Sequence, residues 1–443
     1  MACFEKSKEL FEKAKQVIPG GVNSETRGPA FGIEPGIYPM FISHAKGSHF
    51  WDVDGNEFID YQLGYGPLIL GHSPDVVNEA VERELENGGL LTLSRENEQE
   101  VAREIVDGVP CAEMVRFQST GSAAVAAAAR IARAYTGKEK IARLDLGYHG
   151  WLDEQSIDVA GGLENNYSKK PTFPGIPLNV QENVVILPCN NIEVTEKIIK
   201  RRKDEIAGIL VEPIRPPVVP NKDGYLEFLR EITESNDILL IFDEVKTGFR
   251  VAFGGAQEVL KVTPDLATFS KSLGNGIPIA AVAGKRDIME PTVPKIGLAG
   301  TFNANSVSMA AALATLKALK ADGGKVYRHL YQIGGAFKKG LKDAAEDLGI
   351  KAVVGGPEPM FTIVFTKLEE ITNYRDWLTV VKEDAGQKSR VIFEKKLLDG
   401  KVFHVPNLAS IFFNSSAHTE EDVEKTIQAA QEALREVKKI QGQ

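Results

Sequence analysis

The feature that most constrains the fold of this 443-residue chain is an alternation of short apolar runs with helical segments between residues 96 and 290. Each run is bounded by turn-forming residues, as a buried strand would be. The seven runs are Met114–Gln118, Ile141–Leu146, Val184–Leu187, Ile206–Val211, Ile238–Phe242, Leu266–Phe269 and Ile279–Ala283. Because buried strands separated by helices are typical of parallel sheets, we predict a mostly parallel seven-stranded sheet covered by helices on both faces.

Helical periodicity fills the segments between these runs and extends beyond them. The predicted helices of this region lie near residues 75–88, 97–107, 122–136, 192–203, 225–236 and 309–321. The N-terminal part differs, because an amphipathic helix over residues 4–17 precedes short strand-like pieces at 39–42, 49–52 and 57–61. These pieces, separated by turn residues such as Asp54-Gly55-Asn56, predict a small β-containing segment.

The C-terminal part changes character again. Helices are predicted at 326–347 and 373–398, apolar runs at 361–365 and 410–413, and a final helix after Thr419. This order predicts an α+β domain with an antiparallel sheet, to which the N-terminal segment also contributes. We therefore expect three regions: residues 1–60, 61–320 and 321–443.

Composition narrows the classes of partner. Charged residues make up 26% of the chain and the net charge is −9, so there is no electrostatic reason to expect nucleic acid or an anionic membrane. The three cysteines are scattered, as in a reducing compartment. The N-terminus is charged from Glu5 onward and carries no apolar export segment, so a cytoplasmic location is expected. The histidines lack metal-ligand spacing, so we expect no metal site.

Two chemically active residues follow neighbouring runs. Asp243 ends the run Ile238–Phe242, and Lys271 comes shortly after Leu266–Phe269. In open α/β sheets, ligands bind outside the carboxyl ends of the strands. A pyridoxal cofactor needs a lysine for its Schiff base and a carboxylate for its pyridinium nitrogen. The same two residues are equally compatible with an ion pair at the strand ends.

A third strand end carries an anion-site pattern. The run Met114–Gln118 leads into Thr120, Gly121 and Ser122, where an alanine-rich helix begins. Unpaired amides at a helix N-terminus attract a phosphate, although a Thr-Gly-Ser turn is also an ordinary N-cap. Both interpretations remain open at this point.

Three further residues lie near strand ends. Tyr148 follows Ile141–Leu146 and is suited either to stacking on a flat heterocycle or to closing the core. Val245 is placed to pack on the opposite face of such a ring. Glu212 is a strand-end carboxylate that would contact the cofactor or pair with a lysine or arginine. Their order along the chain, after a phosphate turn and before Lys271, favours a cofactor site.

A set of segments spread over nearly the whole chain matches one known family in the same order. They are Pro19–Ser24, Gly47–Tyr61, Gly66–His72, Tyr148–Gly150, Ile241–Val245, Thr247–Arg250, Pro264-Asp265, Lys271, Gly300-Thr301 and Ala417–Asp422. On these segments the chain resembles the class III (subgroup II) aminotransferases of pyridoxal phosphate (PLP) fold type I, and most closely the glutamate-1-semialdehyde aminomutase-like group.

The resemblance implies roles for the cofactor residues. Lys271 would form the Schiff base and then transfer the substrate proton, while Asp243 would keep the pyridine nitrogen protonated. Tyr148 would stack on the ring and Val245 would support its other face. The phosphate would be held by Gly121 and Ser122, which follow Thr120, and by Thr301 from the neighbouring subunit of a homodimer whose active site lies at the interface.

The resemblance also implies substrate residues. Arg27 matches the family position that binds a substrate carboxylate, for which a planar guanidinium is suited. Tyr65 stands where the aminomutases carry a tryptophan that lines the substrate pocket. Trp151 is a third expected substrate contact, and we expect it, with Arg27 and Tyr65, to determine which reaction is catalysed.

Two departures from the family pattern bear on the reaction. The family's phosphate-turn glutamate is replaced by Ala123, and the aminomutases' glutamate before the Ser-Leu-Ala-His-Thr segment is replaced by Ser410. Because an aminomutase must retain its substrate between two steps, the loss of a carboxylate at Ser410 favours an aminotransferase.

The expected activity is therefore a PLP-dependent aminotransferase. It would move an amino group between a carboxylate-bearing amino acid, including β- or ω-amino acids, or an amine, and a keto acid or aldehyde, by ping-pong through pyridoxamine phosphate. The alternatives are a glutamate-1-semialdehyde 2,1-aminomutase, an amino-acid racemase or epimerase, and a non-catalytic PLP-binding relative. Intact Lys271 and Asp243 argue against the last of these.

Overall fold

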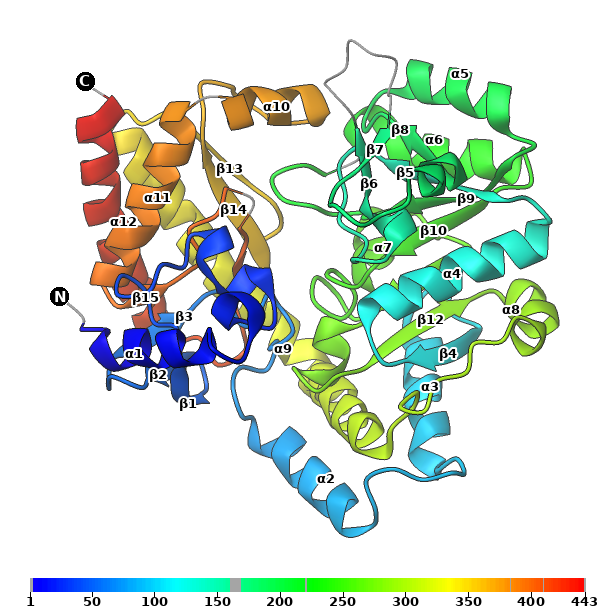
Figure 1. The fold of residues 1–443 in the computed structure, drawn as a ribbon, viewed down its shortest axis with the longest axis horizontal. Helices are drawn as coiled ribbons and strands as arrows, with labels where there is room; N and C mark the ends of the chain where they lie inside the picture. The colour runs from blue at the N-terminus through cyan, green and yellow to red at the C-terminus, as the bar shows by residue number, and fades with distance from the viewer. Residues whose placement is uncertain (1–2, 160–168, 220, 383, 409, 442–443) are drawn as a thin grey trace. The chain divides into compact units, whose positions relative to one another are not determined.

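The computed structural model describes residues 3–159, 169–219, 221–382, 384–408 and 410–441 (Figure 1). The chain forms two compact units, each discontinuous or interrupted in sequence. The central unit contains residues 76–325 and 372–375. The terminal unit contains residues 1–75, 326–371 and 376–443.

A seven-stranded sheet forms the core of the central unit, which confirms the predicted fold class. Its strand order is β4-β12-β11-β10-β9-β5-β8. All neighbouring strands are parallel except β12, which runs antiparallel to both β11 and β4. The strands are β4 (Met114–Gln118), β5 (Lys140–Leu144), β8 (Val184–Leu187), β9 (Ile206–Val211), β10 (Leu239–Asp243), β11 (Leu266–Phe269) and β12 (Ala280–Gly284). A separate hairpin pairs β6 (Ile157–Val159) with β7 (Lys169–Pro171).

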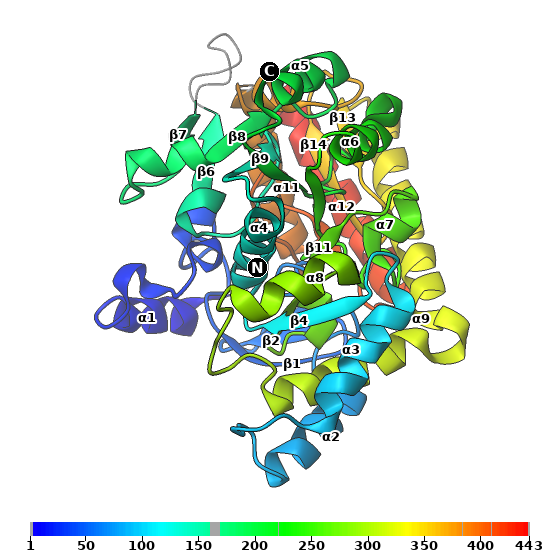
Figure 2. The same cartoon turned by 90° about the vertical axis from the view of Figure 1, so that its right-hand side faces the viewer.

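Helix α4 (Gly121–Thr136) packs across strands β9 to β12 of this sheet (Figure 2). Its alanines allow close approach, and Val125 and Ile131 share one buried cluster with Ile241 of β10. The helix ends at Gly137, whose φ of 72° suits a glycine C-cap. The other helices are α2 (Asp75–Glu86), α3 (Glu96–Gly108), α5 (Ile192–Arg202), α6 (Tyr225–Glu234), α7 (Gly255–Leu260) and α8 (Arg286–Thr292).

The terminal unit is built around two small sheets. One has the order β1-β2-β3-β15, and the other is antiparallel with the order β13-β14-β16. The strands are β1 (Ile42–Lys46), β2 (His49–Asp52), β3 (Glu57–Asp60), β13 (Ala352–Gly355), β14 (Met360–Phe365), β15 (Val402–Phe403) and β16 (Phe412–Phe413). Because β15 pairs with β3, the N- and C-terminal segments of the chain form one structure.

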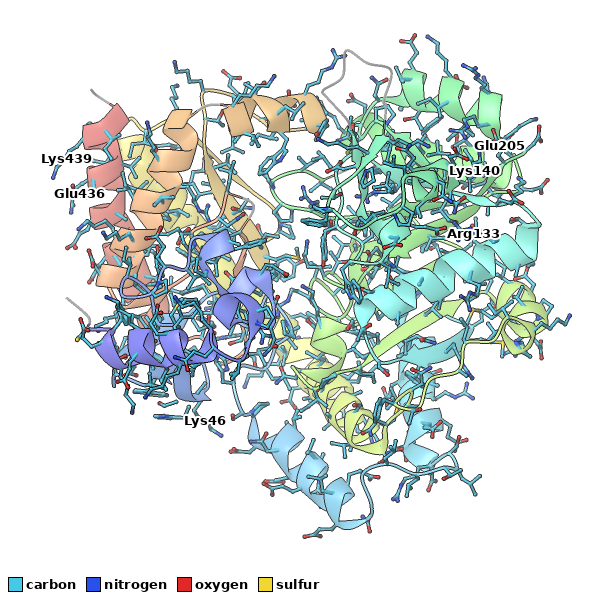
Figure 3. The ribbon with its side chains drawn as sticks, in the orientation of Figure 1. Lys46, Arg133, Lys140, Glu205, Glu436 and Lys439 are labelled. Carbon is cyan, nitrogen blue, oxygen red and sulfur yellow. The ribbon has the colours of Figure 1, made fainter. Side chains whose placement is uncertain are left out.

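Helices cover these sheets and share a core with them. These helices include α1 (Glu5–Ala14), α10 (Tyr374–Lys382), α11 (Asp384–Asp399), α12 (Glu420–Gln441) and the second part of α9 (Ser306–Asp347). Tyr61, Phe337 and Phe412 belong to one buried cluster. Ion pairs at the surface, such as the partly buried pair Lys140–Glu205 and the more exposed pair Lys439–Glu436 (Figure 3), each contribute only about 0–1 kcal/mol. Stability therefore rests on the apolar cores.

Helix α9 (Ser306–Asp347) is interrupted where the two units meet in sequence. Residues 321–324 leave the helical conformation, and Asp322, Gly323 and Gly324 have positive φ. The two parts correspond to the separate helices predicted at 309–321 and 326–347. Among the residues that the structure describes, no helix is long and apolar enough to cross a membrane.

Three local expectations differ from the structure. The strand expected at 39–42 begins only at Ile42, because the amides of Met40 and Phe41 donate to Ser7 Oγ of α1, at 2.7 and 3.2 Å. The helix expected at 373–398 is two helices, α10 and α11; residue 383, between them, lies outside the described residues.

The expected boundaries at 60/61 and 320/321 also differ from those of the compact units. Residues 61–75 stay with the terminal unit because Asp60 anchors them. Its Oδ1 accepts from the amides of Gln62 and Leu63, at 2.8 and 2.9 Å. Its Oδ2 lies 2.8 Å from His72 Nε2.

Candidate functional site

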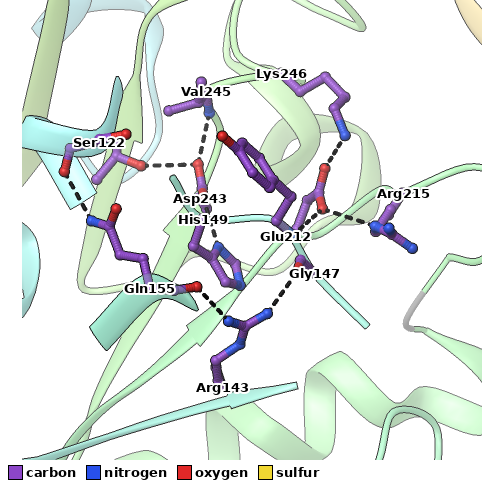
Figure 4. A network of polar contacts seen from close by, with 12 residues as sticks. Ser122, Arg143, Gly147, His149, Gln155, Glu212, Arg215, Asp243, Val245 and Lys246 are labelled. Atoms are coloured by element: carbon purple, nitrogen blue, oxygen red, sulfur yellow. Dashed lines mark hydrogen bonds and ion pairs between the residues drawn. The ribbon is translucent and has the colours of Figure 1, made fainter. Parts of the chain in front are cut away.

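Asp243 is the last residue of β10 and is only 3% exposed. Its carboxylate is held by three donors (Figure 4). His149 Nδ1 lies 2.7 Å from Oδ2, while the amide of Val245 and the hydroxyl of Thr268 donate to Oδ1 at 3.1 and 3.2 Å. The strand end thus presents a buried carboxylate in one orientation.

Lys271 lies beyond the neighbouring strand. Asp243 pairs in parallel register with Thr268 of β11, and Lys271 begins the short 3-10 helix Lys271–Gly274 with a φ of 43°. Burial lowers the pKa of Lys271 to about 7; the charge of Lys246 acts in the same direction, and the carboxylates of Glu212 and Asp243 oppose it. A large fraction of this amine is therefore neutral, and hence nucleophilic, near neutral pH.

The turn between β4 and α4 reaches the same edge of the sheet. A Cβ on Gly121 would lie 3.1 Å from Val245 Cγ1 and 3.7 Å from Ser270 Cβ, so only a glycine leaves this approach unobstructed. Thr120 is the N-cap, and its hydroxyl accepts from the amide of Ala123 at 3.2 Å. The unpaired amides at the start of α4 therefore lie beside the ends of β10 and β11, where they can bind an anion.

The loop after β5 lies against this turn. Gln155 Nε2 donates to the carbonyl of Ser122 at 2.9 Å, and Ser122 Oγ accepts from the amide of Trp151 at 3.4 Å. Tyr148 is 65% exposed and Trp151 is 73% exposed. The interpretation of Tyr148 as a residue that closes the core is therefore wrong, and its ring remains accessible for a ligand.

Glu212, at the end of β9, pairs with two cations. Lys246 Nζ contacts Glu212 Oε1, and Arg215 Nε lies 3.5 Å from Oε2, which also accepts from the amide of Tyr148 at 3.2 Å. Burial opposes ionisation of Glu212, but the charges of Lys246 and Arg215 outweigh it and hold its pKa below the usual value. The sequence left open whether Glu212 would pair with a cation, and it did not single out Lys246 or Arg215.

His149 is the functional candidate that sequence reasoning missed. It is 2% exposed, and burial is the largest cause of its lowered pKa. The neutral imidazole therefore donates its Nδ1–H to the Asp243 carboxylate, which only accepts. The signal for His149 in the sequence is its position between Tyr148 and Gly150 at a strand end, but the sequence analysis assigned a role only to the tyrosine.

Arg27 and Tyr65 lie together in the terminal unit. Arg27 ends the 3-10 helix Glu25–Arg27, and the Tyr65 hydroxyl donates to the carbonyl of Thr26. Burial raises the pKa of Tyr65, and the nearby charge of Arg27 opposes that rise. The two predicted substrate residues are thus neighbours.

Ser410, also in the terminal unit, is buried and engaged on both of its oxygens. Its hydroxyl donates to Gln62 Oε1 at 3.2 Å, and its carbonyl accepts from Thr362 Oγ1 at 2.6 Å and from Arg390 Nη2 at 3.4 Å. A neutral hydroxyl therefore occupies the position where the resemblance to the aminomutases predicts a carboxylate.

Thr301 comes two residues before Asn303, whose Oδ1 accepts from the hydroxyl of Ser119 at 3.2 Å, next to the phosphate turn. Thr301 is exposed and lines a cavity of about 1150 Å³ formed by segments within residues 90–99, 115–117 and 299–306. None of the other predicted site residues lines this cavity. The expected contribution of Thr301 to a neighbouring subunit's site stays a prediction.

Comparison with known proteins places these features in context. A family model described as aminotransferase class-III matches residues 33–382. The chain is 44% identical to a Methanocaldococcus jannaschii protein named glutamate-1-semialdehyde 2,1-aminomutase, over 97% of this chain and 98% of that protein. A solved ω-transaminase from Sphaerobacter thermophilus is 31% identical, with a TM-score of 0.89 over 97% of both chains. A solved transaminase with PLP bound is 27% identical, with a TM-score of 0.87 over 99% of both chains.

Proposed function

The chain belongs to the class III aminotransferase family, and from this premise we propose that it is a glutamate-1-semialdehyde 2,1-aminomutase that uses PLP. The observation that carries the proposal is the 44% identity, over 97% of the chain, to a protein of that name. The geometry at the ends of β10 and β11 supports the cofactor. The reaction would move one amino group from carbon 2 to carbon 1 of a single substrate.

The residues at the strand ends fit PLP. Asp243 offers a buried carboxylate to a protonated ring nitrogen, and Lys271 offers an amine whose pKa is lowered to about 7. Gly121 leaves room at the helix N-terminus, where unpaired amides suit a phosphate. When bound, PLP would supply an electron sink for the bond that is broken on the substrate.

Each residue then has a proposed task around the cofactor. Lys271 transfers the proton between substrate and cofactor carbons, and Asp243 keeps the ring nitrogen protonated. The exposed ring of Tyr148 stacks on one face of the cofactor, and Val245 supports the other. The remaining cofactor contacts proposed are Thr120, Gly121 and Ser122 at the phosphate turn, Glu212 beside Tyr148, and Thr301 from the partner in a homodimer.

The proposed substrate contacts come mainly from the terminal unit. Arg27 binds the substrate carboxylate by a paired hydrogen bond; Tyr65, which lies beside it, and Trp151 are the other substrate contacts proposed. Arg27→Ala should weaken the binding of carboxylated substrates at least tenfold, because a hydrogen bond to a charged group contributes about 1.5–3 kcal/mol. Plain amines, tested with the same variant, should be affected much less; equal losses for both would remove Arg27 from this role.

An aminotransferase is the second candidate, and Ser410 favours it. An aminomutase has to keep its substrate bound between two chemical steps, while a transaminase releases a keto product before the second substrate enters. The hydroxyl of Ser410 brings no charge to this position and already donates to Gln62. Retention of an amine-bearing substrate would then depend on other residues.

The decisive experiment offers the PLP-loaded enzyme one substrate at a time. With glutamate-1-semialdehyde alone, we expect the isomer that carries its amino group on carbon 1, without any added amino donor or acceptor. Formation of a keto acid from single amino donors, with no isomerisation, would replace the proposal by the aminotransferase. Exchange of the α-proton with solvent, without either product, would instead indicate a racemase or epimerase.

Ser410→Glu provides a matched variant for the same assay, with Ser410→Gln as the uncharged control of equal size. If an aminotransferase is the native activity, the glutamate variant should gain isomerisation relative to the glutamine variant. If the native enzyme is already an aminomutase, neither variant should gain activity.

A further inference from the structure

Arg143 is a buried arginine that no proposed step uses. It lies in β5, between β8 and β9, and is 6% exposed. Its guanidinium donates to three backbone carbonyls: Nη1 to Gln155 at 2.7 Å and Ile157 at 3.1 Å, and Nη2 to Gly147 at 2.5 Å. These bonds fasten both ends of the loop that carries Tyr148, His149 and Trp151 (Figure 4).

The bond to Gly147 fixes the chain where it passes the His149 ring. A Cβ on Gly147 would lie 2.7 Å from His149 Nε2, so the backbone and the imidazole are in close contact. On its other side, the same ring donates from Nδ1 to Asp243 Oδ2 at 2.7 Å. His149 is thus held between a backbone segment tied to Arg143 and the carboxylate at the end of β10.

Charges from three strands act on His149. Burial is the largest cause of its lowered pKa, and the positive charge of Arg143 on β5 lowers it further. Asp243 at the end of β10 and Glu212, which directly follows β9, oppose this effect. Arg143 makes no ion pair among the described residues; three backbone carbonyls accept from its guanidinium, and the more distant carboxylates of Asp158, Glu212 and Asp145 also favour its charge. A buried cation so placed disfavours an imidazolium beside it.

We propose that Arg143 is a positioning residue, which acts through the Gly147 backbone and the neutral His149 ring to hold Asp243 in the orientation and charge state that the cofactor requires. Arg143 itself need not touch cofactor or substrate. Both candidate reactions need the same protonated ring nitrogen, so the proposal does not depend on which of them the enzyme catalyses. Losing a guanidinium that makes three hydrogen bonds should therefore change the cofactor site at a distance.

The first test is made on the apo protein. We would follow the His149 ring nitrogens by ¹⁵N NMR during a pH titration, with signals assigned by His149→Gln. In Arg143→Met, the midpoint of His149 protonation should rise by about one pH unit or more, because a nearby positive charge is removed. In Arg143→Lys the charge stays, so the midpoint should remain near that of the unaltered protein.

Arg130→Met is the matched control. Arg130 is exposed on α4, lines the same cavity of about 550 Å³ as Arg143 and His149, and, like Arg143, donates to backbone carbonyls, those of Ile296 and Gly297. Within the part of the chain that the structure describes, it forms no hydrogen bond to Gly147. We expect no change in the His149 titration. If Arg143→Met titrates like the unaltered protein while remaining folded, the proposal is overturned.

The second test separates position from charge. Gly147→Ala keeps Arg143 but places a methyl group against the His149 ring, so we expect this variant to bind PLP about tenfold more weakly. We expect the same loss of PLP affinity in Arg143→Lys, because lysine cannot make the hydrogen bonds to the three carbonyls. Gly175→Ala, where an added Cβ meets nothing within 4 Å, is the control. PLP affinity unchanged in both Gly147→Ala and Arg143→Lys would contradict the positioning role, even if either variant is less stable.

Discussion

The imidazole of His149 lies 2.7 Å from the carboxylate of Asp243, although 94 residues separate them in the chain. Because the buried ring is neutral, it serves as a donor and leaves the negative charge on Asp243. That charge is what a protonated pyridine nitrogen needs at this position. The pair is thus the part of the site on which the proposed cofactor chemistry most depends.

Asp243→Asn should abolish most activity without unfolding the protein. The asparagine oxygen can still accept from Val245 and Thr268, which share one oxygen of the carboxylate, and its NH2 group can donate to His149 Nδ1 in the other tautomer of the ring, but the negative charge is lost. We expect turnover to fall by about a hundredfold or more, as when a preorganised electrostatic group is removed. The control is Thr268→Val, which removes one donor to Asp243 and keeps its charge; a loss of only a few-fold is expected there. Full activity in Asp243→Asn would contradict the assignment.

The capture of PLP by Lys271 should depend on pH with a midpoint near 7. The neutral amine is the nucleophile, and the folded-state pKa is lowered to about 7. Capture should therefore speed up as pH rises through 7 and level off above it, whereas a free lysine would continue to accelerate towards pH 10. Stopped-flow absorbance after mixing apo protein with PLP measures this rate. A midpoint above pH 9 would refute the lowered pKa.

Lys246→Met should move that midpoint upward. After burial, the positive charge of Lys246 is the largest influence that lowers the Lys271 pKa, and its removal also leaves more of the Glu212 charge uncompensated. We expect the midpoint to rise by about one pH unit. Arg215→Met removes the other cation beside Glu212 and should have a smaller effect. Equal shifts in the two variants would show that Glu212, and not Lys246, controls Lys271.

Gly150→Ala should weaken binding of the cofactor phosphate. Gly150 has a φ of 113°, and an added Cβ would lie 2.2 Å from Gln155 Oε1 and 2.5 Å from Ser122 Oγ. The loop would have to move away from the helix N-terminus, so PLP affinity should fall at least tenfold, the equivalent of about 1.4 kcal/mol. Gly137→Ala is the control: its φ of 72° is also positive, but an added Cβ meets nothing within 4 Å, so it should lose some stability but not affinity.

The terminal unit should lose stability in mild acid through His418. Burial lowers the pKa of this side chain to about 4, against the opposing charges of Asp422 and Asp60. Between pH 6.5 and 4 the unfolded chain binds a proton that the folded protein does not, so stability falls as pH decreases through this window. The full loss is about 3 kcal/mol. Denaturant unfolding of His418→Phe across this range should show a correspondingly shallower pH dependence.

The sequence by itself determined the sheet, most helices and the identity of Asp243 and Lys271. Apolar runs such as Ile206–Val211 are buried along their whole length. Such a local pattern can be recognised without knowing which strands become neighbours in the sheet. The strand expected at 39–42 failed for the opposite reason: Met40 and Phe41 donate to Ser7, some thirty residues earlier, and no local pattern reveals that competing acceptor.

Only the tertiary structure decided what surrounds the two chemical residues. His149 next to Asp243 and Lys246 next to Glu212 are contacts between residues that follow different strands, and the parallel register of β5, β9, β10 and β11 brings these strand ends together. The bonds from Arg143 in β5 to the carbonyls of Gln155 and Ile157 likewise join a strand to the far end of the loop that follows it. The lowered pKa of Lys271 arises from burial and from these neighbouring charges, which are properties of packing in three dimensions. Periodicity along the chain predicts which strands form, but the environment of a side chain depends on which strands become neighbours.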